Sequence, residues 1–478
     1  MDKLPKHIHI VGICGVATSA LAIAFHERGV KVTGSDKGFY PPVSTYLQDF
    51  GIQYHAGWHP EKIAEYGKPD IMIAGGSGTS LSNPEIMYAK EQSIPLLSFA
   101  EALGKYIVKE NSIVTAGTWG KTTSSALLSF ILIQAGMNPS YFTGGLSLSH
   151  PTGSISDSKW SVVEGDEYQV AIYDKRPKFV YYKPTHLMLT SVSWDHADLY
   201  PTEKEYFQAF EKLVAEVPKT GVLLICNDDA GARKTTDRLK RPVVSYGKTT
   251  EAHYYYHDIV STKDGLHFKI TCKKGTFEIK TPMLGRFNAE NITGCFAMSM
   301  EIGIPAEKIV KAIDDFKGIR RRFEKRLDGE IGSTSNGITV FDCHAPTPEK
   351  AASILETLRE VYDKKIIAIY EPNIGGRQRE TISKYNGAFA LADIVIIPKL
   401  TKLKVADQGS DGNAKDLPME GEELASTISK THSHVEYVDN DDGAVSRAVS
   451  HARKGDIIVF MGSHGFRGMI EAVVEELK

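Results

Sequence analysis

The stretch from Ser112 to Phe130 constrains the fold most strongly, because it joins a buried strand to a helix through a glycine-containing loop. It reads SIVTAGTWGKTTSSALLSF, in which a β-branched apolar run precedes Gly117 and Gly120 and an apolar helical run follows them. Such a unit is typical of a parallel sheet covered by helices. A loop in this position directs backbone N–H groups and the positive end of the helix dipole at one point, so it predicts an anion site.

The residues of this loop predict that the anion is a nucleotide triphosphate. Glycine permits the turn and a close approach of phosphate, Lys121 would contact the β and γ phosphates, and the Thr122 hydroxyl would bind Mg²⁺. The loop is shorter than a full Walker motif because Thr115 stands at the first glycine position, and bulky Trp119 precedes the last glycine. The predicted ATP-binding residues of the loop are Gly117, Thr118, Gly120, Lys121, Thr122 and Thr123.

Acidic groups and a histidine follow two other predicted strands. The first group is Glu164, Asp166 and Glu167, and the second is Asp195, His196 and Asp198. The carboxyl ends of parallel strands converge on the edge where the phosphate loop lies, so these side chains could hold Mg²⁺, which prefers oxygen ligands. The alternative interpretation is that they are solvated loop tips.

Length, charge and cysteine usage restrict the number of domains, the class of partner and the cellular compartment. A chain of 478 residues exceeds a single ordinary core, so several domains are expected. The net charge of −3 gives no general attraction to nucleic acid or to an anionic membrane. The 5 cysteines are scattered without a CxxC pair, which is typical of a reducing compartment. Without a signal-like or membrane-spanning apolar run, we expect a cytoplasmic protein.

Alternating strand-like and helical runs predict an α/β fold. The first third alternates in this way from HIHIVGI onward, and a second unit begins with the strand that leads into the phosphate loop. Residues 250–285 look instead like antiparallel strands joined by Lys/Gly turns, and a third unit starts near Gly318. Residues 400–416 have the composition of a mobile loop.

The first strand–loop–helix unit leaves its ligand open. HIHIVGICGVATSALA carries Gly12 and Gly15, and Asp36 follows the next strand, which is a weak dinucleotide fingerprint. A dehydrogenase that binds NAD(P) is therefore one interpretation of this unit. The segment GGSGTSLSNPE, residues 75–85, is either a second anion-contacting loop or a plain Gly/Ser connection.

Six motifs together resemble the Mur ligases, the ATP-dependent amide-forming enzymes of cell-wall precursor synthesis. They are TAGTWGKTT (115–123), EGDE (164–167), DHAD (195–198), NDD (227–229), GRFNAEN (285–291) and GIRRRFE (318–324). Within the family, GSDKGFYPPVST (34–45), the stretch 164–184 and MGSHGFRGM (461–469) are most similar to the branch that joins UDP-N-acetylmuramate to a murein tripeptide. The branch that adds alanine is the next most similar.

The resemblance implies three domains and a reaction. A Rossmann-like UDP-sugar domain would span 1–107, a P-loop ATPase-type domain with a mixed sheet 108–318, and a Rossmann-like acceptor domain 319–478. ATP would convert a sugar carboxylate into an acyl phosphate, and an amine would then attack it and release phosphate. ATP, one or two Mg²⁺ ions, a UDP-N-acetylmuramate-type sugar and an amino acid or peptide are implied. We expect a monomer or weak homodimer that binds neither nucleic acid nor membrane.

The resemblance also implies residue roles. Thr122 and Glu164 would hold one Mg²⁺, and His196 the second. Asn288 would bind adenine, Arg322 would reach the γ-phosphate, and Asp342 would bind ribose. Lys121, Glu164, His196 and Arg322 form the predicted catalytic set. The UDP-sugar would contact Gly12, Gly15, Ser35, Asp36, Ser77 and Asn83.

Two arginine-containing loops after strands of the third unit are candidates for acceptor binding. Arg377 and Arg379 lie in EPNIGGRQRETISKY, and His464 and Arg467 lie in GSHGFRGM. Guanidinium groups suit the carboxylates of an amino acid or peptide. A purely structural role for both loops is the alternative.

The sequence departs from the family pattern at three places. Trp119 stands where Asn, His or Lys is usual, Phe287 replaces a frequent histidine, and Cys343 stands at a second aspartate, with Pro346 and Thr347 at two histidines. These departures motivate two alternatives. One is a ligase with pseudomurein or poly-amino-acid partners, and the other is a degenerate protein that binds nucleotide or UDP-sugar without turnover.

Overall fold

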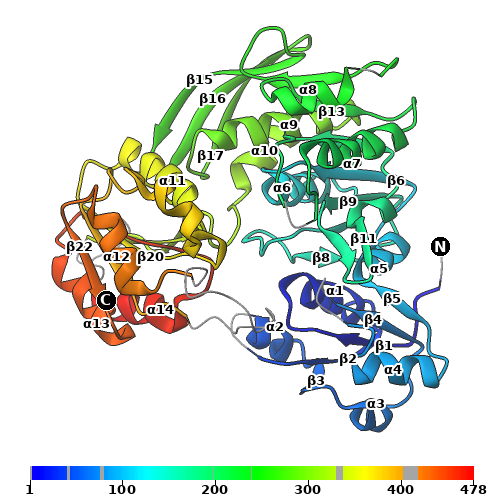
Figure 1. Cartoon of the computed structure of the whole chain (residues 1–478). Coiled ribbons are helices and arrows are strands. Elements are labelled where there is room, and N and C mark those ends of the chain that lie inside the picture. Colours follow the sequence, from blue (N-terminus) through cyan, green and yellow to red (C-terminus); the bar gives the residue numbers. More distant parts are fainter. Residues whose placement is uncertain are drawn as a thin grey trace. The chain divides into compact units, whose positions relative to one another are not determined.

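The computed structural model describes residues 3–39, 43–75, 80–196, 199–237, 239–329, 337–401 and 418–478. The chain divides into a first compact unit that ends at Ile319 and a second that begins at Arg320. Residues 261–265 and 283–286 group with the second unit. The sheets of both units are drawn in Figure 1. In the part of the chain that the structure describes, no helix is long and apolar enough to cross a membrane.

The amino-terminal part of the first unit is a parallel sheet of 5 strands in the order β3-β2-β1-β4-β5. The strand order reverses beside β1, and ligands of open α/β sheets bind at such a switch point. The loop after β1 and Gly75, the residue that follows β4, lie there. The elements are β1 (His7–Val11), α1 (Val16–His26), β2 (Lys31–Asp36), α2 (Val43–Asp49), β3 (Gln53–Ala56), α3 (Pro60–Tyr66), β4 (Ile71–Ala74), α4 (Pro84–Glu91), β5 (Leu96–Ser98) and α5 (Phe99–Tyr106).

The central part of the first unit is a mixed sheet of 10 strands in the order β17-β16-β15-β14-β13-β12-β6-β9-β7-β8. Its elements are β6 (Asn111–Ala116), α6 (Lys121–Gln134), β7 (Ser140–Phe142), β8 (Gly153–Ser154), β9 (Trp160–Gly165), β10 (Gln169–Ala171), β11 (Asp174–Pro177), η1 (Lys178–Tyr181), β12 (His186–Leu189), α7 (Glu203–Glu216), β13 (Leu223–Cys226), α8 (Ala230–Thr236), β14 (Val244–Gly247), β15 (Tyr254–Thr262), β16 (Gly265–Cys272), β17 (Gly275–Thr281), α9 (Phe287–Glu301) and α10 (Ala306–Asp315).

Both faces of the central sheet are covered by helices. Leu187 and Leu189 of β12 belong to the apolar core that includes α7, whereas Met188, which points to the other face, lies against α9. The strands β12, β6 and β9 are adjacent and parallel, so their carboxyl ends share one edge of the sheet. The predicted antiparallel segment contains the antiparallel pair β16 and β17, but β15 pairs with β14 in parallel.

The second unit is a sheet of 6 strands in the order β18-β19-β23-β20-β21-β22, in which only the pair β18 and β19 is antiparallel among the described pairings. Its elements are β18 (Glu324–Leu327), β19 (Thr339–His344), α11 (Pro348–Val361), β20 (Ile366–Glu371), η2 (Gly375–Arg377), η3 (Arg379–Tyr385), β21 (Ile394–Pro398), α12 (Gly421–Ser429), β22 (Val435–Val438), α13 (Asp441–His451), β23 (Ile457–Gly462), η5 (Phe466–Gly468) and α14 (Met469–Leu477).

Apolar residues alternate between the two faces of this sheet, which explains its continuous apolar strands. Ala368 and Tyr370 of β20 pack with α11 and α12, whereas Ile367 and Ile369 pack with α13 and α14. The predicted α/β fold class, with Rossmann-like outer sheets and a mixed central sheet, is confirmed. The predicted domain boundaries stay a prediction. The loop expected to be mobile, 400–416, falls almost wholly outside the described residues.

Candidate nucleotide and metal site

The phosphate loop has the backbone conformation that its glycines predict. Gly117 has φ +140° and Gly120, which caps α6, has φ +84°, a region that side chains other than glycine rarely adopt. A Cβ atom at Gly117 would overlap the Thr190 hydroxyl, and one at Gly120 would lie 2.5 Å from Asn291 Oδ1. Close packing against β12 and α9 therefore requires glycine at both positions.

The segment after β12 holds the first half of the loop in place. Thr118 N donates to Ser191 O and Trp119 N to Ser191 Oγ, both at 2.9 Å. The Thr118 hydroxyl donates to Ser193 O at 2.9 Å. These donors are directed to protein acceptors, whereas the first N–H groups of α6 have no acceptor within the helix. The start of α6 is thus the part of the loop suited to an anion.

Lys121 is buried against Glu167 in the base of the loop. Its ammonium lies 2.9 and 3.0 Å from the two Glu167 carboxylate oxygens and donates to Gly117 O at 2.5 Å. Burial disfavours the charged form, but Glu167 outweighs it and raises the pKa of Lys121 above its usual value. The lysine is therefore a fixed positive charge, as phosphate binding requires. The EGDE run offers three carboxylates as candidate Mg²⁺ ligands, and the fold pairs Glu167, one of them, with Lys121.

Thr122 and Glu164 lie in contact, as a shared metal ion would require. The Thr122 hydroxyl donates to Glu164 Oε1 at 3.1 Å. Gly144 N donates to Glu164 Oε2 at 2.7 Å, and Ser125 Oγ donates to the same oxygen at 3.4 Å. A hydroxyl and an oriented carboxylate form an oxygen donor set that fits Mg²⁺. Neither Ser125 nor Gly144 was predicted, because neither forms part of a recognisable motif.

His196 joins the same cluster through Glu167. Its Nε2 lies 3.6 Å from Glu167 Oε1, its ring contacts Tyr168, and about a third of the side chain (34%) is exposed. Bonding to Glu167 is the main cause that raises the pKa of His196. The structure thus brings Lys121, Glu164 and His196 to the adjacent ends of β6, β9 and β12. Asp198 lies outside the described residues.

The predicted adenine residue lies beside the phosphate loop. Asn288 is 6% exposed and accepts a hydrogen bond from Asn291 Nδ2 at 3.2 Å. Asn291, in turn, lies against Gly120. Phe287 and Trp119 are 49% and 56% exposed, so the two departures from the family pattern near this site present aromatic surface to solvent.

In the second unit, Arg321 makes the contacts that anchor its segment. Its guanidinium donates to Asp342 Oδ1 at 3.2 Å and to the carbonyls of Gly462 and Ser463 at 3.0 Å each. Burial raises the pKa of Asp342, and Arg321 opposes that shift. Arg322, for which we predict contact with the γ-phosphate, follows Arg321 in the chain. From the sequence alone, the three consecutive arginines could not be divided into those that anchor the segment and those that could contact a ligand.

The predicted acceptor residues divide into two kinds. Arg377 is 2% exposed and donates to Met419 O, Thr401 O and Glu420, so its guanidinium is occupied within the fold. Arg467 likewise donates to buried Glu371, at 2.8 Å, and to Asp441.

Arg379 and His464 are more accessible. Arg379 pairs with Glu423 on the surface, each with 41% of its side chain exposed, and His464 is exposed after β23. The acceptor role of all four residues stays a prediction, and the two exposed residues are the better placed to meet a ligand.

Five of the six predicted UDP-sugar residues lie in the described part of the chain, around the switch point of the amino-terminal sheet. Gly12 has φ +85°, and a Cβ there would lie 3.3 Å from Gly75 O, so the loop after β1 packs against the residue that follows β4. Gly15 caps α1, and Asp36 Oδ2 accepts from Cys14 N at 2.8 Å, which fixes the first loop. Ser77 lies outside the described residues.

Ser35 and Asn83 are tied to a buried carboxylate that sequence reasoning missed. Glu85 has 0% exposure, accepts from the Ser35 hydroxyl, and accepts from His55 Nε2 at 2.8 Å. Asn83 Oδ1 accepts from Glu85 N at 2.8 Å at the start of α4. Despite burial, the nearby His9 imidazole and the hydrogen bond from Ser35 lower the pKa of Glu85. This network positions the carboxyl end of β2 and the start of α4.

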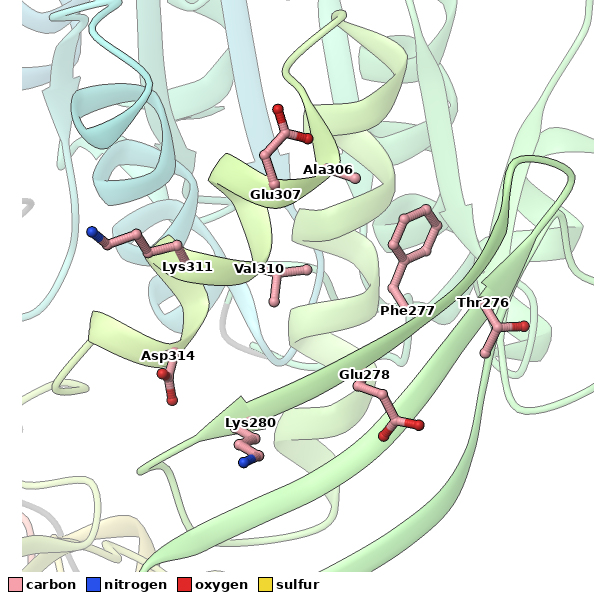
Figure 2. Close-up of a pocket in the computed structure, with 9 residues that line it drawn as sticks. All are labelled: Thr276, Phe277, Glu278, Lys280, Ala306, Glu307, Val310, Lys311 and Asp314. Atoms are coloured by element: carbon pink, nitrogen blue, oxygen red, sulfur yellow. The ribbon is translucent and has the colours of Figure 1, made fainter.

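A separate groove of about 660 Å³ lies between β17 and α10 (Figure 2). Phe277 and Val310 form its apolar floor, and charged side chains such as Lys280 and Asp314 surround it. None of the predicted site residues lines it, so this groove is not the candidate nucleotide site.

Comparison with known proteins identifies the family. Residues 114–299 match the Mur ligase middle domain, 7–110 match "Mur ligase family, catalytic domain", and 321–464 match "Mur ligase, glutamate ligase domain". The UDP-N-acetylmuramate–L-alanine ligase of Rhodopseudomonas palustris is 30% identical over 492 aligned residues, which cover 100% of this chain and 99% of the relative. The chain belongs to the Mur ligase family.

Relatives from two branches of the family match at full length. The UDP-N-acetylmuramate–L-alanyl-γ-D-glutamyl-meso-2,6-diaminoheptandioate ligase of Haemophilus influenzae is 28% identical, covering 99% of each chain. The crystal structure of UDP-N-acetylmuramate–alanine ligase from Thermotoga maritima has a TM-score of 0.78 and 22% identity, covering 99% of each chain. Mur ligases are ATP-dependent enzymes that form a C–N bond, and the family resemblance predicted from the motifs is confirmed.

Proposed function

We propose that this Mur ligase joins the carboxylate of a UDP-N-acetylmuramate-type sugar to the amine of an amino acid or peptide, and releases ADP and phosphate. The observation that carries the proposal is the convergence of Lys121, Glu164 and His196 at the ends of three adjacent strands beside the glycine loop. Full-length relatives with this type of activity support it.

The residues suit phosphoryl transfer to a carboxylate. Lys121 supplies a fixed positive charge at the start of α6, where N–H donors and the helix dipole also favour phosphate. Thr122 and Glu164 would hold Mg²⁺, with His196 near a second ion, and the metal would neutralise phosphate charge. The sugar carboxylate would attack the γ-phosphorus, ADP would leave, and the amine would displace phosphate from the acyl phosphate.

The acceptor is an L-alanyl peptide or L-alanine in this proposal, because relatives of both branches match the chain over its whole length. Exposed Arg379 and His464 are the acceptor candidates. A ligase with non-murein partners is the second candidate, motivated by Cys343, a departure from the family pattern that is fully buried in the core of the second unit.

A phosphate-release assay tests the function. UDP-N-acetylmuramate is combined with ATP, Mg²⁺ and either L-alanine or the murein tripeptide, and release is expected only when sugar and amine are both present. Lys121→Ala should abolish release, whereas Lys105→Ala on α5 is a matched surface control. Release without the amine, or unchanged release by Lys121→Ala, would contradict the proposal.

We also propose a cytoplasmic enzyme that acts as a monomer or weak homodimer. The structure describes all 5 cysteines, and each is free, in keeping with a reducing compartment. Sedimentation at micromolar concentration should show mainly monomer, and a stable higher oligomer would contradict this part.

A further inference from the structure

Two imidazoles and a carboxylate converge on one point beside the edge strand β22 of the second unit. His434 precedes β22 and Glu436 lies on it two residues later, so their side chains point to the same face. His451 is the last residue of α13. His434 Nε2 lies 3.0 Å and His451 Nε2 2.7 Å from the same oxygen, Glu436 Oε1.

The distances resemble those within a metal coordination sphere. One potential ligand atom from each of the three residues lies within 4.8 Å of the others. With metal–nitrogen bonds of about 2.0–2.1 Å, neighbouring ligand atoms of a tetrahedral ion lie about 3.3 Å apart. Lengthening the 3.0 Å pair by about 0.3 Å and the 2.7 Å pair by about 0.6 Å would therefore adapt both nitrogen–oxygen pairs to an ion. The imidazole rings are perpendicular, at 90° with centroids 5.4 Å apart, so they are not stacked face to face.

We propose that His434, Glu436 and His451 bind one late first-row divalent cation, of the Zn²⁺ class, with water completing the coordination. Two nitrogen donors and one carboxylate suit such ions and disfavour Mg²⁺ and Ca²⁺, which take oxygen ligands. The three side chains are 45%, 21% and 24% exposed, so an ion can reach them from solvent. Binding through both Nε2 atoms would require them to be unprotonated, so uptake of the ion would release any proton that they share with Glu436.

Arg447 is the neighbouring group that opposes the ion. It lies one turn before His451 on α13, and its Nε is 3.6 Å from Glu436 Oε2. Its positive charge competes with the cation for the carboxylate. Removing the charge of Arg447 should therefore increase the affinity for the cation. If the cluster only stabilised the fold, no such increase would be expected.

This site is separate from the phosphate loop, since it belongs to the second unit and uses none of the residues assigned to ligation of the sugar and amine. The ion would clip the end of α13 to the edge strand β22. The proposed metal site and the proposed ligase function can therefore be tested separately.

Equilibrium dialysis of the full chain against Zn²⁺, with excess Mg²⁺ present to occupy oxygen sites, tests the proposal. The wild type should bind one more equivalent than the double variant His434→Gln/His451→Gln. Glu436→Gln should weaken that site at least tenfold, and Arg447→Gln should strengthen it severalfold. His257→Gln is the matched control, because His257 forms a similarly exposed histidine–carboxylate pair with Asp258 in the first unit.

Circular dichroism without metal verifies that each variant is folded. Electron paramagnetic resonance of bound Cu²⁺ should show coupling to two nitrogens in the wild type, and that signal should be lost in the double variant. Equal Zn²⁺ stoichiometry and Kd in the wild type and the double variant would overturn the proposal. Binding of the extra equivalent only at millimolar Zn²⁺ would overturn it as well.

Discussion

Replacing Glu167 with glutamine should destabilise the first unit in a way that ATP relieves. Glu167 is 2% exposed and pairs with Lys121, whose side chain is 13% exposed. Removing one partner of a buried ion pair costs about 3–5 kcal/mol, because the other charge stays buried without compensation. Glutamine keeps the size and one acceptor, and Lys121 keeps its bond to Gly117 O, so we expect about 3 kcal/mol, the lower end of that range.

Urea unfolding followed by tryptophan fluorescence measures this loss, because all 4 tryptophans lie in the first unit. ATP should stabilise Glu167→Gln at least as much as the wild type, since its phosphates supply the missing negative charge. Turnover should fall, because His196 also loses its partner. Glu203→Gln, at an exposed position on α7, is the matched control. An unchanged urea midpoint, or a variant that ATP no longer stabilises, would refute the reasoning.

Three further changes test other parts of the account. His196→Ala should lower turnover by at least about 100-fold with ATP affinity nearly intact, and unchanged turnover would remove it from the metal set. Trp119→His should change the free energy of unfolding by no more than about 0.5 kcal/mol, since the indole is 56% exposed. If the ring covers the nucleotide, the same variant should bind ATP about fivefold more weakly, and equal ATP affinity would exclude that contact. Burial lowers the pKa of His7 to about 4, so the unfolded state binds more protons between pH 6.5 and 4. Stability should thus fall as the pH falls through that range, and by less in His7→Gln, so an equal pH slope in that variant would contradict this.

The phosphate loop and its neighbours could be predicted because their signals are local. A strand, two glycines and a helix fix where Lys121 and Thr122 lie, and parallel strands bring Glu164 and His196 to the same edge. The overall α/β organisation followed from the alternation of apolar runs in the same way. These features depend on short-range pattern and on the geometry of one sheet.

The acceptor residues were harder to predict, because residue type does not reveal burial. Arg377 and Arg467 look like carboxylate ligands in sequence, yet the fold uses both guanidinium groups internally. No sequence motif marked Glu85, although residues of β1, β2, β3 and the segment before α3 contact its carboxylate. Such partners are distant in sequence, and only tertiary structure brings them together.

A crystal structure of the enzyme with Mg²⁺ and a non-hydrolysable ATP analogue tests the central claim most directly. The account predicts that the triphosphate lies at the start of α6, that Lys121 contacts its β or γ oxygens, and that a metal ion is bound by Thr122 and Glu164. A triphosphate bound elsewhere, with the loop between Gly117 and Lys121 devoid of ligand, would contradict it.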